Sequence, residues 1–91
     1  MLKINYNGLI ADMREEDLEA GIAYLSQCGR GERRQILRSA EEALDRVLRL
    51  PSDERNAFSE QQLQHIANDI GIWFVGEVLA GRAEQYGTAV Q

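Results

Sequence analysis

The segment from residue 59 to about residue 82 constrains the fold of this chain more than any other. Ser59 is followed three residues later by Gln62, the pattern of a capping box at the start of a helix. Phe58 and Leu63 occupy the two positions of a hydrophobic staple around that start. We therefore predict a long helix over residues 59–82.

This predicted helix carries apolar stripes on two faces. The main stripe has six residues at helical spacing: Leu63, Ile66, Ala67, Ile70, Trp73 and Phe74. A second stripe on the opposite side consists of Ile72, Val75 and Leu79, at positions i, i+3 and i+7. A helix that is apolar on two faces has to be covered on two faces. Either an N-terminal arm or a second copy of the chain could cover the second stripe, and we expect a homodimer that uses these three residues.

Two more helices are predicted before this one, over residues 12–28 and 31–50. Asp12, with Glu15 three residues later, has the pattern of a capping box for the first, and Gly29 is expected to end it in the left-handed conformation. Pro51 ends the second, because the residue before a proline is disfavoured in a helix.

The N-terminal residues alternate between apolar and polar. Leu2, Ile4 and Tyr6 fall on one side, and Asn7-Gly8 is a turn signal. This pattern predicts a short extended arm or strand. The expected fold is therefore an all-α single domain over residues 1–91, with three main helices and an N-terminal arm.

The composition limits which cellular compartment and which binding partners we expect. The chain has 91 residues, a net charge of −5 and one cysteine, so no internal disulfide can form. No apolar run reaches the roughly 18 residues that a membrane span requires, and the first residues lack the apolar core of a signal peptide. We expect a cytoplasmic protein without a membrane partner, and an acidic balance disfavours indiscriminate binding to nucleic acid.

One basic cluster opens the second predicted helix, and it is the candidate site for nucleic acid. It consists of Arg30, Arg33, Arg34 and Arg38. Arg30, Arg34 and Arg38 recur every four residues and share a face, as phosphate contacts would require. The alternative is a solvated face on which Arg38 pairs with Glu41 or Glu42 at helical spacing.

Few residues of the sequence are candidates for catalysis. His65 lies beside the main stripe and is expected to be a half-exposed surface side chain, and Cys28 at a helix end is expected to be a small core residue. The sequence has no spacing typical of a metal site and no glycine-rich phosphate loop. We expect no enzyme activity, no cofactor and no metal.

Glu77 is the unusual residue, since it projects into the main apolar stripe. Either the stripe has reached the edge of the core there and the carboxylate extends into solvent, or Glu77 is a partly buried carboxylate that holds an arginine such as Arg82.

The size of the chain and the exclusions above favour binding to another protein. We expect a small regulator, adaptor or inhibitor of bacterial or phage type that acts through helix surfaces. The alternative is a dimeric DNA-binding transcriptional regulator that uses the N-terminal strand or the arginine face.

Overall fold

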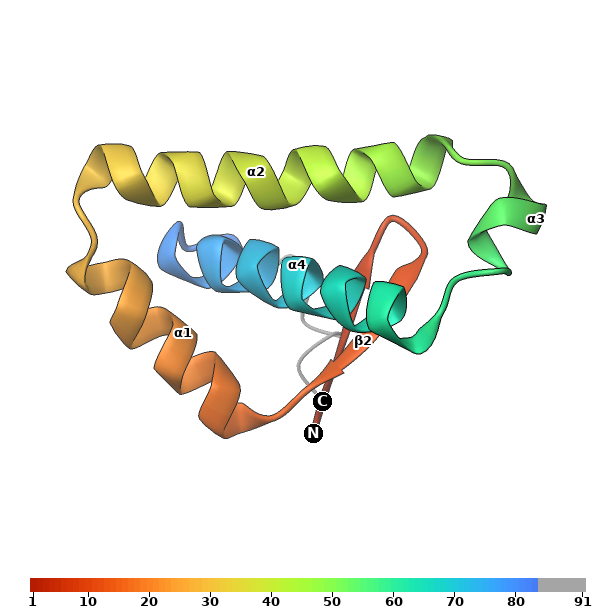
Figure 1. Ribbon diagram of the computed structural model, residues 1–91. Helices are drawn as coiled ribbons and strands as arrows, with labels where there is room; N and C mark the ends of the chain where they lie inside the picture. The colour runs from red at the N-terminus through yellow and green to blue at the C-terminus, as the bar shows by residue number, and fades with distance from the viewer. Residues whose placement is uncertain (84–91) are drawn as a thin grey trace.

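The computed structural model describes residues 1–83, which form a two-stranded sheet and four helices (Figure 1). The elements in chain order are β1 (Leu2–Tyr6), β2 (Leu9–Met13), α1 (Glu15–Gln27), α2 (Arg30–Arg49), α3 (Ser52–Arg55) and α4 (Glu60–Leu79). The mostly helical architecture and the N-terminal strand are confirmed. A second strand and the short helix α3 were not predicted.

The N-terminal arm is one half of a β-hairpin. Asn7 and Gly8 both have positive φ, +48° and +102°, as a two-residue hairpin turn of type I′ requires. β2 then pairs antiparallel with β1, from Tyr6 opposite Leu9 to Leu2 opposite Met13. The prediction that Asp12 caps the first helix is therefore wrong. Asp12 lies in β2, and α1 begins at Glu15 after Arg14, which makes no side-chain cap.

The junction between α1 and α2 is short, and its backbone is extended. Cys28 and Gly29 both have extended backbone, with φ of −71° and −62°. Gly29 is therefore not the left-handed stop that we predicted; it is the residue from which α2 starts. Arg33 bridges the junction, since its Nε donates a hydrogen bond to the Leu25 carbonyl oxygen at 2.9 Å. This contact satisfies one of the carbonyls that the end of α1 leaves without a helical partner.

The start of α4 is the element that the sequence predicted best. The Ser59 side chain accepts a hydrogen bond from the Gln62 backbone, and the Gln62 side chain accepts one from the Ser59 backbone, so the capping box is confirmed. The helix ends at Leu79, earlier than predicted. Gly81 has a φ of +76°, and Arg82 N–H donates to the Glu77 carbonyl oxygen at 2.8 Å. These contacts form a Schellman motif, which stops the helix.

α4 is the central element of the fold. In Figure 1, α2 runs alongside it in the opposite direction, while α1 and the hairpin pack at its two ends. The core cluster joins β1 and α4 to α2; its fully buried members are Ile4, Leu44, Ile70 and Phe74. Leu63, expected in the main stripe, is instead 52% exposed because it lies at the first turn of α4, beyond the packed part.

Helix α1 covers part of the second stripe of α4, an arrangement that was not predicted from the sequence. Val75 is 2% exposed and packs against Gly21 of α1. A Cβ atom at Gly21 would lie 2.8 Å from Cγ2 of Val75, so the two helices approach closely at this point. α1 therefore covers Val75, whereas Ile72 and Leu79 of the same stripe are half-buried.

Candidate functional site: a groove over the central helix

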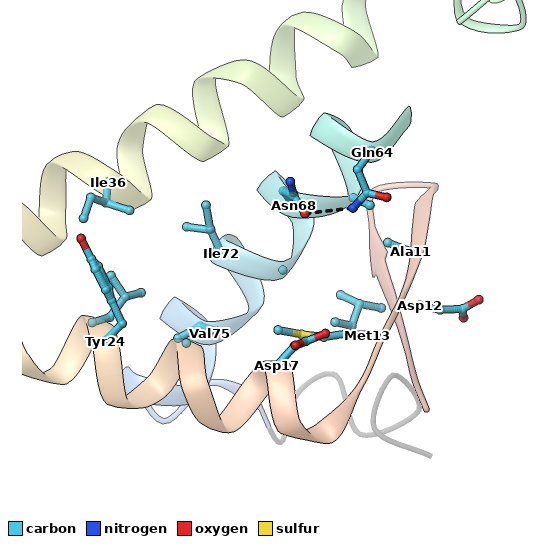
Figure 2. Close-up of a pocket in the computed structure, with 15 residues that line it drawn as sticks. Ala11, Asp12, Met13, Asp17, Tyr24, Ile36, Gln64, Asn68, Ile72 and Val75 are labelled. Atoms are coloured by element: carbon cyan, nitrogen blue, oxygen red, sulfur yellow. Dashed lines mark hydrogen bonds between the residues drawn. The ribbon is translucent and has the colours of Figure 1, made fainter. Parts of the chain in front are cut away.

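An apolar groove of about 650 Å³ lies over α4, between α1, α2 and β2 (Figure 2). Its volume falls within the roughly 300–1,000 Å³ that is typical of binding pockets. The groove exists because α1 and α2 diverge from their junction at Cys28-Gly29, so that each packs on α4 but few contacts join them to one another.

Each surrounding element contributes apolar side chains to this groove. Tyr24 of α1 and Ile36 of α2 form its two walls at the narrow end, and Ile72 of α4 lies beside them (Figure 2). Tyr24 is 52% exposed, which is unusual for a large ring beside a core. On the floor, Ala67 and Gly71 lie four residues apart on α4, and both are half-buried. Small residues at this spacing permit another helix to approach closely.

The wide end of the groove is more polar. Gln64 and Asn68, one turn apart on α4, are joined by a hydrogen bond from Nε2 of Gln64 to Oδ1 of Asn68 at 3.1 Å. The charged residues that line the groove are both carboxylates, Asp12 and Asp17. Asp17 accepts a hydrogen bond from Arg14 at 3.1 Å, whereas Asp12 points away from the groove in Figure 2.

Two residues of the predicted self-association stripe line the groove: Ile72, which is half-buried, and Val75, which is buried against α1. Leu79 is half-buried near the end of α4 and does not line the groove. Whether any of them contacts a second copy stays a prediction.

The predicted arginine cluster divides into two parts. Arg30, Arg34 and Arg38 are exposed, while Arg33 is half-buried and binds the end of α1. Within residues 1–83 no carboxylate lies within ion-pair distance of the three exposed arginines. The predicted pairing of Arg38 with Glu41 or Glu42 is therefore not formed.

The remaining polar candidates do not converge on one point. His65 is exposed and Cys28 is half-buried. Burial raises the pKa of Asp69 above its ordinary value, and the opposing effects of the nearby His65 and Arg46 are smaller. In the described part of the chain, no group of three His, Cys, Asp or Glu residues is placed to hold a metal ion.

Glu77 is buried, with 6% of its surface exposed, and it is paired. Its Oε2 accepts a hydrogen bond from Nε of Arg82 at 2.5 Å. Arg82 is held beside it by the Schellman motif that ends α4. The pair therefore links the helix end to a carboxylate inside the core.

A second groove, of about 660 Å³, was missed by the sequence analysis. It lies between β2, α3 and the first turns of α4, and its lining includes Ile10, Arg55, Phe58 and Leu63. The alternation of Leu9, Ala11 and Met13 after the Asn7-Gly8 turn was the signal that could have revealed β2.

No protein-family model matches this chain, and no curated protein or solved structure matches it either. Among the described residues, no helix combines the length and apolar character needed to cross a membrane.

Proposed function

We propose that this chain is a small protein-binding module, acting as a regulator, adaptor or inhibitor, that holds an amphipathic helix of another protein in the groove over α4. The observation that carries this proposal is the groove itself, with apolar walls from α1 and α2 and a floor of small residues. Helices bind such grooves through apolar side chains at positions i, i+3, i+4 and i+7.

The chemistry of the groove specifies the helix further. A bound helix would cover Tyr24 and the part of α4 around Gly71, and so would remove from water apolar surface that the chain leaves exposed. The carboxylate of Asp17 and the acidic first turn of α1 lie at the wide end. We therefore expect basic residues on the polar flank of the partner helix at that end.

A photocrosslinking experiment tests this function in the cells that make the protein. Benzoylphenylalanine is placed at position 24, in the wall of the groove, and in a matched control at position 63. Tyr24 and Leu63 are both 52% exposed, but Leu63 lies outside this groove. We expect position 24 to crosslink to one helical segment of another protein. Crosslinks that are equal at both positions, or absent at position 24, would contradict the proposal.

Binding of the identified segment is then measured with two lysine variants. Tyr24→Lys should weaken it about tenfold or more, as expected when a charge replaces an aromatic anchor, and Leu63→Lys should leave it unchanged. Circular dichroism of both variants checks that the fold is retained.

DNA binding through the arginine face is the second candidate. The exposure of Arg30, Arg34 and Arg38, together with the absence of ion pairs to them within residues 1–83, favours it. Affinity for duplex DNA would fall steeply with salt, and Arg34→Ala with Arg38→Ala would abolish it. Binding that persists in this double variant would move the contact to the N-terminal strand.

A further inference from the structure

The second groove, between β2, α3 and the first turns of α4, leaves apolar side chains exposed to solvent. Ile10 on its β2 side is 60% exposed, and Leu63 on its α4 side is 52% exposed. Phe58 and Ile66, both half-buried, also line this groove. A ligand with apolar side chains would therefore remove this surface from water on binding.

The polar residues of the second groove all lie on α3 or directly after it. They are Ser52, Arg55 and Asn56, and Arg55 is the one charged residue among those that line the groove. Asn56 is exposed, and its side-chain amide offers both a donor and an acceptor. The groove is therefore amphipathic, with an apolar surface from β2 and α4 and a single positive charge on its α3 side.

The guanidinium of Arg55 is held in place but has no counter-ion. Its Nε is buried without an acceptor among the described residues, and its Nη2 makes one long contact of 3.5 Å, to Oγ of Ser52. Nη1 makes no hydrogen bond within residues 1–83 and is not buried as Nε is. No carboxylate of this part of the chain lies within ion-pair distance of Arg55. A carboxylate from outside could bind at Nη1, and a charge-assisted hydrogen bond of this kind is about twice as strong as a neutral one.

Two features specify the ligand that would supply this carboxylate. Asp53 and Glu54 are exposed on α3 beside Arg55 but do not line the groove, so their negative charges disfavour a run of acidic residues and leave room for one. A small-molecule pocket encloses most of its ligand. Here Ile10 and Leu63, on opposite sides, are both more than half exposed, which is typical of a surface groove that binds the side chains of a peptide.

We propose that the second groove binds a short peptide segment of another protein in which one acidic residue adjoins large apolar residues. The acidic side chain pairs with Arg55, the apolar side chains cover Ile10 and Leu63, and Asn56 is placed to bind the peptide backbone. The first groove is lined by carboxylates and is expected to prefer a basic flank, so the two grooves select segments of opposite charge. Crosslinks from position 63 would then report a segment that differs from the one captured at position 24.

Selection from a library of random heptapeptides displayed on phage tests the chemistry of this ligand. Phage are first depleted on Arg55→Gln and then selected on the wild-type chain, so that peptides which need Arg55 remain. We expect the enriched peptides to carry one Asp or Glu next to large apolar residues. They should still bind Arg49→Gln, a matched control in which an exposed arginine outside both grooves loses the same charge. No enrichment, or enriched peptides without a carboxylate, would overturn the proposal.

A double-mutant cycle on the best peptide tests the contact with Arg55 by isothermal titration calorimetry. Arg55→Gln should raise the dissociation constant about tenfold, and so should glutamine in place of the peptide's acidic residue. If the two groups touch, both changes together cost no more than either alone. Fully additive losses, in a variant whose circular dichroism matches the wild type, would refute the contact.

Amide chemical shifts of the labelled chain locate the same peptide. We expect the largest changes at Ile10, Arg55 and Leu63, and small ones at Tyr24 and Ile36 of the first groove. Ile10→Lys should weaken binding about tenfold or more, since it places a charge in the apolar part of the groove. Changes centred on Tyr24 would refute the location. Displacement of the peptide by octanoate at a similar concentration would assign the groove to small amphipathic carboxylates and overturn the peptide.

Discussion

The close approach of α1 to α4 at Gly21 leads to the sharpest stability prediction. A Cβ at this position would lie 2.8 Å from Cγ2 of Val75, a separation that real Cβ atoms essentially never show. Val75 cannot easily move away, because it is buried and a β-branched side chain in a helix has one strongly preferred rotamer. Gly21→Ala should therefore push the two helices apart.

The expected change in the free energy of unfolding follows from two opposing effects. Replacing a glycine inside a helix by alanine stabilises it by about 1 kcal/mol. Forcing an extra methyl group into a packed contact costs about 1–3 kcal/mol. Gly21→Ala should then lower the free energy of unfolding by about 0–2 kcal/mol. Gly71, also in a helix and half-buried, provides the control, because a Cβ there would meet the nearest atom, Cε of Met13, at an ordinary 3.5 Å.

Urea unfolding followed by far-ultraviolet circular dichroism measures both variants. We expect Gly71→Ala to stabilise the chain and Gly21→Ala to lie about 1–3 kcal/mol below it, which isolates the packing cost. Val75→Ala should be less damaging in the Gly21→Ala background than in the wild type, since it removes the methyl group that clashes. Equal effects of the two alanine substitutions would mean that α1 does not pack on α4 at this point.

Three further predictions concern single side chains. Ser59→Ala removes the cap of α4 and should cost about 1 kcal/mol of stability; an unchanged urea midpoint would mean that the cap contributes nothing. Tyr6→Phe removes the 2.7 Å hydrogen bond from the Tyr6 hydroxyl to Oδ1 of Asp45, which ties β1 to α2, and should cost about 1–2 kcal/mol on the same measurement. Asp69→Asn should stabilise the chain at neutral pH, because burial raises the pKa of Asp69 and so disfavours its charged form. This last difference should shrink as the pH falls through the pKa of Asp69, where the carboxyl is protonated; a difference that grows in acid would contradict it.

In the hairpin, local sequence patterns do not by themselves decide between a strand and the start of a helix. Asp12 with Glu15 matches a capping box, and Asn7-Gly8 followed by alternating apolar residues matches a hairpin, so the two signals overlap on the same few residues. Packing selects between them. Ala11 is buried on the core-facing side of the sheet, and the Met13 side chain lies next to Gly71 of α4. A helix that started at Asp12 would not place these two residues in this way.

The groove could not be predicted for a different reason. Tyr24 and Ile36 each fit an ordinary helix, and their positions as facing walls depend on the angle between α1 and α2. That angle depends on the extended backbone of Cys28 and Gly29, where a left-handed helix end was predicted, and on the close contact of Gly21 with Val75, which is a tertiary property. The capping box at Ser59, by contrast, involves only residues within one turn, and the sequence predicted it correctly.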